Sequence, residues 1–346
     1  MKKKWCVFGA IGLACFLLVI GCIYAIASNF GKTKEEITVF APDGAPALAL
    51  AKLLDEDDDK DGVNYSVVSA TGIEARVTYE DETKNADVCI LPLTDASLHL
   101  SDGQNYQLVG VVTHGNFFLL SENGETQYTT DNLSDLIGKK IGFVQLGKLP
   151  GLVFQSILKR ENIPYKVQSD LASCEENVVN LVNVKPTDVK KNVGFDVFAV
   201  PEPAATAKIK GAGFSLVGSV QALYGGENGY AQAVVVAKRS IIKNNAVWLD
   251  KFVAMLKENA SGQPNDWLKT VNTEKILTAI NSHLDSGLTP SFTENNLTSG
   301  VISACGVRYA GGYSSKTEIN ALIAALKEVN PNAVKDFSDD FFTEKY

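Results

Sequence analysis

The chain has 346 residues, 45% of them hydrophobic, and a formal net charge of -8 at pH 7. This composition excludes a disordered chain and is sufficient for roughly two domains, each with its own core. No long basic run follows Lys4, so the charge pattern argues against nucleic acid as a partner.

The first residues have the pattern of an export segment. Lys2, Lys3 and Lys4 precede an uncharged run from Trp5 to Ala27, which is long enough to cross a bilayer. Positive charge ahead of such a run stays on the cytoplasmic side. We therefore expect residues 1–28 to be a signal peptide or a membrane anchor, and the rest of the chain to be extracytoplasmic and tethered to the cell membrane.

Two forms of this tether fit the residues. The stretch from Val19 to Cys22 (VIGC) resembles a bacterial lipobox, in which Cys22 becomes the lipidated N-terminus. However, Ile23 to Ala27 stay apolar, which favours an uncleaved anchor helix instead. The sequence leaves both forms open.

The cysteines and histidines predict no metal site. Cys89 lies in an apolar run and Cys305 among small residues, so both are expected to be buried free thiols, and a disulfide between Cys174 and Cys305 stays open. The histidines are scattered, and the acidic run that begins at Asp57 has Val68 where a calcium loop needs a glutamate. We predict neither a metal nor a cofactor.

The stretch GFVQLGK (142–148) has the spacing of a nucleotide-binding phosphate loop. Leu149 stands where a hydroxyl would hold Mg²⁺, and Gly142 falls inside an apolar run typical of a strand. Because Pro150 favours the first turn of a helix, we interpret this segment as a strand followed by a helix N-terminus, a place that binds ligands in α/β proteins.

From Ile37 onward, short apolar runs alternate with helical periods. The first half predicts strands at 37–42, 65–70 and 87–93, a helix at 45–56, and a long strand-like passage at 106–122 that has Gly115 and Asn116 in its middle. The second half predicts strands at 139–145, 165–169 and 195–200, helices at 150–161 and 175–184, and another long strand-like passage at 230–239. The remainder has helical periodicity.

This order predicts two α/β lobes that are joined by two crossing strands. We expect lobe 1 to comprise residues 36–115 and 236–346, and lobe 2 to comprise residues 116–235. A ligand cleft is expected between the lobes, at the carboxyl ends of the strands.

Six stretches of the chain together resemble a known family. They are PDGAPALALAKLL (42–54), ADVCILPLTDA (86–96), LVGVVTHGNFFLLS (108–121), SDLIGKKIGFVQLG (134–147), FDVFAVPEPAAT (195–206) and GYAQAVVVAKR (229–239). In this order they are similar to the substrate-binding lipoproteins of ABC importers that handle nitrate, alkanesulfonates, taurine and thiamine-type pyrimidines. The resemblance implies a type II periplasmic-binding-protein fold, no catalysis, a small-molecule ligand, and partnership with an ABC permease and its ATPase.

The resemblance also implies which loops contact the ligand. The candidate ligand-binding residues are Asp43, Gly44, Ala45, Thr71, Gly72, Thr94, His114, Asn116, Gly147, Lys148, Glu202, Tyr224, Tyr230 and Gln232. Backbone N–H groups at the helix start near Gly44 suit an anionic or polar group, and Lys148 is the main positive charge at these loops. The same polar residues also suit local roles, as helix caps or as partners of the nearby backbone.

Two other functions fit the same fold. One is an enzyme similar to the pyrimidine synthases of thiamine biosynthesis, and the other is a sensor protein that has no transported ligand. The small number of basic residues at the candidate loops favours a neutral or heteroaromatic solute, although backbone amides alone can bind a sulfonate or nitrate.

Overall fold

The computed structural model describes residues 36–57, 62–124, 126–226 and 229–346. The lipobox-like stretch at 19–22 and the acidic residues Asp59 and Asp61 lie outside the described residues. Within these four ranges, no helix has the length and apolar character needed to span a membrane.

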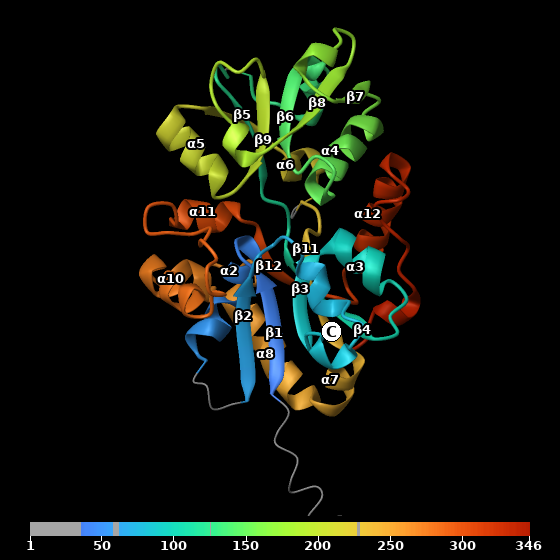
Figure 1. Ribbon diagram of the computed structural model, residues 1–346, viewed down its shortest axis with the longest axis vertical. Coiled ribbons are helices and arrows are strands. Elements are labelled where there is room, and N and C mark those ends of the chain that lie inside the picture. Colours follow the sequence, from blue (N-terminus) through green and yellow to red (C-terminus); the bar gives the residue numbers. More distant parts are fainter. Residues whose placement is uncertain (1–35, 58–61, 125, 227–228) are drawn as a thin grey trace, which may run out of the picture. The chain divides into compact units, whose positions relative to one another are not determined.

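A first mixed sheet of six strands has the order β12-β4-β11-β3-β1-β2 (Figure 1). Its strands are β1 (Ile37–Pro42), β2 (Val63–Val68), β3 (Val88–Pro92), β4 (Tyr106–Thr113), β11 (Ala233–Lys238) and β12 (Val307–Gly311). β1 runs parallel to β3, whereas β11 is antiparallel to both β3 and β4. β-branched residues fill the buried centre of β11 (AVVVAK), as expected for a strand covered on both faces.

A second mixed sheet of six strands has the order β10-β5-β9-β6-β8-β7. Its strands are β5 (Phe117–Ser121), β6 (Lys140–Val144), β7 (Tyr165–Gln168), β8 (Val179–Val184), β9 (Val197–Pro201) and β10 (Ser215–Ser219). β6, β7, β8 and β9 form the parallel part, and β5 and β10 add antiparallel strands at one edge. The two sheets with their helices form two lobes, so the predicted α/β architecture is confirmed.

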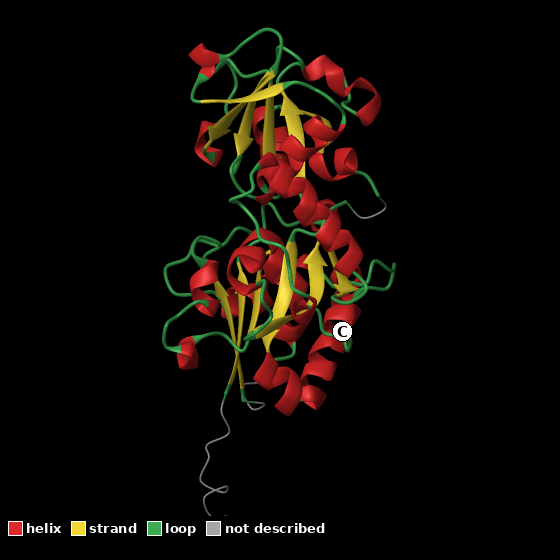
Figure 2. Cartoon of the chain, turned by 90° about the vertical axis from the view of Figure 1, so that its right-hand side faces the viewer, coloured by secondary structure: helices red, strands yellow, loops and turns green. Residues whose placement is uncertain are grey.

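Helices connect and cover the strands (Figure 2). They are α2 (Ala45–Asp55), α3 (Leu93–Leu100), α4 (Leu149–Arg160), α5 (Ala204–Ala212), α6 (Val220–Tyr224), α7 (Arg239–Asn244), α8 (Ala246–Asn259), α9 (Trp267–Thr270), α10 (Thr273–Ser282), α11 (Ser299–Ala304) and α12 (Lys316–Val329). α2 packs against α8 and α10, and α3 packs on β3 and β11. A proline in the first turn starts both α2 and α4, where its missing N–H costs no hydrogen bond.

One predicted element is wrong. Residues 175–184 were expected to form a helix, but Val179–Val184 form β8, between β6 and β7 in the second sheet. The stretch VNLVNV is rich in β-branched residues, and all of it except Asn183 is buried, so it pairs on both sides as an interior strand.

The chain passes between the two sheets twice. The first crossing consists of His114, Gly115 and Asn116, between β4 and β5. The second lies between α6 and β11, and its described residues are 225–226 and 229–232. All of β11, from Ala233 onward, belongs to the first sheet, whereas the prediction assigned residues up to 235 to lobe 2. The limits of the lobes stay a prediction.

Glycines bring the backbones of the crossings close together. A Cβ atom on Gly306 would lie 2.4 Å from the carbonyl oxygen of Gly115, and a Cβ atom on Gly229 would lie 3.0 Å from that of His114. Gly115, Gly229 and Gly306 also have positive φ angles of 72°, 75° and 62°. Only glycine meets both demands at these positions.

A third link between the lobes is made by α12. This helix belongs to the C-terminal part of the chain and packs against α4 of the second lobe. At the end of the contact, the Lys159 ammonium donates to the Glu328 carbonyl oxygen (3.0 Å) and pairs with its carboxylate (3.1 Å).

The described cysteines carry free thiols. Cys89 and Cys305 are buried, as predicted, and Cys174 is half-buried. Burial raises the pKa of both the Cys89 and the Cys305 thiol, which keeps them protonated.

Candidate functional site

The loop after β1 holds its shape through the Asp43 carboxylate. One carboxylate oxygen accepts a hydrogen bond from the Gly44 N–H (2.7 Å) and the other accepts one from the Ser291 N–H (2.7 Å). Gly44 has a φ of 98° and starts α2 without a side-chain cap. Asp43 therefore orders this loop and holds the Gly44 N–H at the start of α2.

The loops after β2 and β3 supply two threonines in different settings. Thr71 and Gly72 are exposed, and Gly72 has a φ of 80° at the start of a 3-10 turn. Thr94 is buried in the first turn of α3, which also begins without a side-chain cap. The Leu93 N–H of that turn donates to the Gln232 carbonyl oxygen (3.0 Å), so the start of α3 is fixed to the second crossing.

The loop after β6 brings Gly147 and Lys148 to the surface of the second lobe. Gln145 has a φ of 63°, which is uncommon for a residue with a side chain and is found preferentially at functional sites. Its carbonyl oxygen accepts from the Lys148 N–H (2.9 Å), which closes a tight turn, and Lys148 then starts α4 without a side-chain cap. Gln145 was not among the predicted site residues, and no local sequence pattern marks it.

Asp95 and Lys148 interact electrostatically across the two lobes. Burial raises the pKa of the Asp95 carboxyl above its ordinary value, and the positive charge of Lys148 opposes that rise. This interaction requires the loop after β3 and the loop after β6 to lie near each other. This interaction favours the predicted approach of the strand-end loops from the two lobes, which stays a prediction.

A hydrogen-bonded network joins the two crossings. The Gln232 side-chain amide donates to the Asn116 side-chain oxygen (3.0 Å), and the Gln232 N–H donates to the Thr113 carbonyl oxygen (2.9 Å). The Asn116 carbonyl oxygen in turn accepts from the Glu202 N–H (3.1 Å). These contacts bring three of the predicted site residues together: Asn116, Glu202 and Gln232.

Among the described residues, four buried polar side-chain atoms at or next to the crossings have no hydrogen-bond partner. They are Thr113 Oγ1, His114 Nδ1, Tyr230 Oη and Gln232 Oε1. Burial, together with the nearby Arg308 charge, lowers the pKa of His114 to about 4, so the imidazole is neutral near pH 7. Unpaired buried polar atoms each cost about 1 to 3 kcal/mol, and they concentrate where a ligand or an ordered water completes the structure.

Glu202 and Tyr224 have local partners. The Glu202 carboxylate accepts from both the N–H (3.1 Å) and the hydroxyl (2.8 Å) of Thr206, in the first turn of α5. Tyr224 packs edge-on against Tyr230, with ring centroids 5.7 Å apart. The cap for α5 that the sequence offered as an alternative role for Glu202 is thus observed.

Within the described residues, we describe two pockets that contain predicted site residues. The first has a volume of about 760 Å³ and includes Gly147 and Lys148. Its other polar side chains are Gln145, Gln155, Asn183, Lys185 and Asn330, none of which was predicted from the sequence. Asn330 follows α12, so the C-terminal part of the chain contributes to this pocket.

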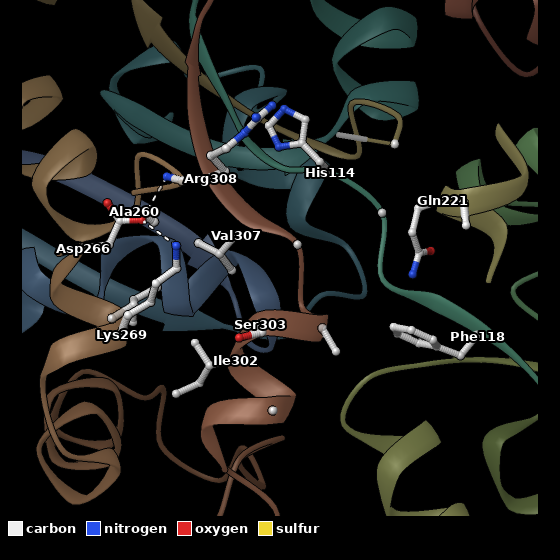
Figure 3. Close-up of a pocket in the computed structure, with 18 of the residues that line it drawn as sticks. His114, Phe118, Gln221, Ala260, Asp266, Lys269, Ile302, Ser303, Val307 and Arg308 are labelled. Carbon is white, nitrogen blue, oxygen red and sulfur yellow. Dashed lines mark hydrogen bonds and ion pairs between the residues drawn. The ribbon is translucent and has the colours of Figure 1, made fainter. Parts of the chain in front are cut away.

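The second pocket has a volume of about 820 Å³ and lies beside the crossings (Figure 3). His114 is the predicted site residue in its lining. Its remaining residues come from the two crossings, β5, α6, the segment from the end of α8 through α9, and the segment from α11 to β12. The structure therefore separates the predicted residues into strand-end loops and crossing residues.

Comparisons of the sequence with family models and with curated proteins find no match. The fold, in contrast, has many solved relatives. It is similar to an ABC transporter protein from Parabacteroides distasonis (16% identity, 90% of this chain and 100% of that chain, TM-score 0.66). It is also similar to the periplasmic aliphatic sulphonate binding protein SsuA from Escherichia coli (14% identity, 90% and 93%, TM-score 0.62).

A third similar structure is the alkanesulfonate-binding protein SsuA from Xanthomonas axonopodis pv. citri bound to MOPS (14% identity, 87% and 95%, TM-score 0.53). At these identities the likeness shows a shared fold. The predicted type II periplasmic-binding-protein fold is therefore confirmed, and the structural neighbours are substrate-binding proteins of ABC transporters.

Proposed function

We propose that this protein is the solute-binding component of an ABC importer, and that it binds its solute between the strand-end loops of the two lobes. The observation that carries the proposal is the electrostatic influence of Lys148 on the Asp95 carboxyl, because the two residues belong to different lobes and lie at the start of α4 and in the first turn of α3. Helices α2 and α4 begin at these loops without side-chain caps, and a helix N-terminus favours a polar or anionic group.

Solute capture in this fold is a change in the positions of the lobes. A ligand that contacts both lobes favours the arrangement in which both sets of contacts form. In this chain the change requires torsion at His114, Gly115 and Asn116 and in the second crossing. The protein acts by binding and delivery, with an ABC permease and its ATPase as partners, and it is held outside the cytoplasm by residues 1–28.

The first experiment identifies the solute. Mass spectrometry of small molecules released from the purified full-length protein is followed by calorimetry with the released compound. Alkanesulfonates, taurine, nitrate and thiamine-type pyrimidines are titrated in parallel. We expect one class to bind and to raise the melting temperature in proportion to the logarithm of its concentration.

The second experiment locates the solute. Replacement of Lys148 by Ala is expected to weaken binding about tenfold to a hundredfold, as typical for a lost polar contact to a buried ligand. Lys190→Ala, at another exposed lysine of the second lobe, is the matched control and should leave the affinity unchanged. Equal affinity of wild type and Lys148→Ala would contradict the proposed location. Chemical conversion of the bound compound would favour the alternative function, an enzyme similar to the pyrimidine synthases.

A further inference from the structure

The pocket at the start of α4 lies at the carboxyl ends of two neighbouring strands of the second sheet. Its lining includes residues 144–148, at the end of β6, and 183–186, at the end of β8, and these two strands pair in parallel. Gln155 of α4 and Asn330, after α12, also line it. The lining residues and their neighbours in sequence all belong to the described part of the chain.

The backbone of Leu146 fixes the orientation of two side-chain amides in this pocket. Its N–H donates to Asn183 Oδ1 (3.1 Å), and its carbonyl oxygen accepts from Gln155 Nε2 (3.4 Å). Gln155 Nε2 also donates to the Gly151 carbonyl oxygen (3.1 Å). Because an N–H needs an acceptor and a carbonyl oxygen needs a donor, each amide can bind this backbone in one orientation only.

The other polar atoms of the two amides are Asn183 Nδ2 and Gln155 Oε1. Neither of them has a hydrogen-bond partner among the described residues. Gln155 is buried, with 7% of its surface exposed, yet it lines the pocket. A buried acceptor without a donor is costly, so a ligand that supplies a donor is favoured there. The pocket therefore offers a donor from Asn183 and an acceptor from Gln155.

A close backbone contact holds Gln155 in this place. A Cβ atom on Gly151 would lie 2.1 Å from the Leu146 carbonyl oxygen, so only glycine allows the first turn of α4 to come this near to the loop. Gln155 follows Gly151 by four residues and lies on the same face of the helix. Its side chain can therefore reach both carbonyl oxygens.

The charged side chains of the lining are lysines. Lys148 and Lys185 contribute ammonium groups, and no carboxylate is among the described residues of the lining. Asp95, whose carboxyl is influenced by Lys148, lies outside it. The neighbouring acidic residues have partners of their own: Asp188 accepts from the Lys185 N–H (2.9 Å), and Glu328 pairs with a lysine of α4 (3.1 Å). Together with the start of α4, these groups suit an anion.

We propose that Gln155 determines which class of solute the protein binds. The solute carries an anionic group, held by Lys148, Lys185 and Asn183, and a neutral hydrogen-bond donor such as a hydroxyl group, held by Gln155 Oε1. This inference rests on the proposed function, because the pocket includes the Lys148 loop of the proposed solute site. An analogue of the same size without the donor leaves the buried oxygen unpaired, and sites of this kind reject such analogues strongly.

The probes are 2-hydroxyethanesulfonate and 1-propanesulfonate. Both carry one sulfonate charge, and the hydroxyl group of the first takes the place of a methyl group in the second. Calorimetry on the dialysed full-length protein measures both affinities. We expect the hydroxyl probe to bind about tenfold to a hundredfold more tightly. Equal affinities, or binding of neither probe at millimolar concentration, would overturn the proposal.

A variant of Gln155 assigns the preference to this residue. Gln155→Met keeps a side chain of similar length without the acceptor, so the ratio of the two affinities should fall to about one. Gln104→Met, at an exposed glutamine of the first lobe, is the matched control and should keep the wild-type ratio. Both affinities are measured on the same protein, so an inactive fraction does not change their ratio. A wild-type ratio in Gln155→Met would overturn the role of Gln155.

A variant of Lys185 tests the anionic end without touching the contacts of Leu146. Lys185→Gln removes an exposed charge and is expected to weaken both probes about tenfold while keeping their ratio. Unchanged affinity of both probes would overturn the placement of the anionic group. This variant and the wild-type ratio keep the test decisive if Gln155→Met does not fold.

Lys148→Ala separates this inference from the proposed function. If it weakens both sulfonates, and the wild type binds the two equally, the solute site stands and the donor requirement is wrong. If it leaves the binding of the compound released from the purified protein unchanged, and the wild type still prefers the hydroxyl probe, the proposed function is contradicted. The pocket would then be a ligand site of its own.

Discussion

The Gln232 side-chain amide donates a hydrogen bond to the Asn116 side-chain oxygen across the two crossings, at 3.0 Å. Asn116 is buried, with 5% of its surface exposed, and the other amide atom of Gln232, Oε1, has no partner. Because the hydrogen bond is buried, water cannot readily replace it when one partner is removed.

Replacement of Asn116 by Ala is expected to lower the free energy of unfolding by about 1 to 3 kcal/mol, because it leaves the Gln232 amide without an acceptor. Urea denaturation of the full-length protein measures the change. Asn295→Ala, at an exposed asparagine, serves as the control and should change stability by less than about 0.5 kcal/mol. A matching loss in both variants would contradict the role assigned to the Gln232 contact.

The depressed pKa of His114 predicts a loss of stability in mild acid. The folded-state value is about 4 and the ordinary value is 6.5, so between these pH values the unfolded chain binds a proton that the folded chain does not. Stability contributed by the neutral imidazole is thus present above pH 6.5 and is lost as the pH falls towards 4, by about 3 kcal/mol in total.

Urea denaturation at several pH values between 7 and 4 checks this expectation. His114→Gln should remove the part of the pH dependence that comes from this residue, whatever its effect on stability at pH 7. His99→Gln, at an exposed histidine of α3, should keep the wild-type slope. The assignment to His114 fails if His114→Gln and the wild type lose stability in parallel.

Gly306→Ala is expected to disrupt the contact between β12 and the first crossing. The added Cβ atom would lie 2.4 Å from the Gly115 carbonyl oxygen, and the φ of 62° adds backbone strain. We expect a loss of more than about 2 kcal/mol, seen as a lower melting temperature. Gly211→Ala, in α5 with open space around it, should be neutral or stabilising by up to about 1 kcal/mol.

The tether is tested at Cys22. If the stretch from Val19 to Cys22 is a lipobox, Cys22→Ser should block processing, and the mature wild-type protein should begin at a lipidated Cys22. Mass spectrometry of the protein isolated from membranes measures both. A mature protein that retains Lys2 to Gly21 would instead establish an uncleaved anchor helix.

Local sequence patterns were sufficient for the elements that position the strand-end loops. A proline in the first helical turn after an apolar run predicted the starts of α2 and α4. Gly142 lies inside strand β6, which agrees with the prediction that this segment is not a phosphate loop. Strand β8 was mistaken for a helix because short apolar runs with polar interruptions fit both periods. Strands β10 and β12 were missed because neither is a long apolar run.

The site was less accessible to sequence reasoning than the fold. One oxygen of the Asp43 carboxylate accepts a hydrogen bond from the Ser291 N–H. Ser291 is far along the chain, so no local pattern predicts this pairing. The strained backbone of Gln145 and the approach of Asn330 to the same pocket also arise from tertiary structure. The positions of the loops could be predicted from the ends of the strands. The hydrogen-bond partners of their polar groups could not.

The packing of α12 against α4 restricts the path that the lobes can take when they move. Two crossings alone would allow the lobes to swing and twist about a flexible pair of connections. Helix α12 packs on α4, and Lys159 is hydrogen-bonded and ion-paired to Glu328. Twisting of one lobe against the other must therefore slide α12 along α4. Rotation of the lobes about an axis near these two helices needs little repacking. Helix α12 thereby limits twisting between the lobes, so its removal would allow the lobes to twist as well as to rotate about the hinge.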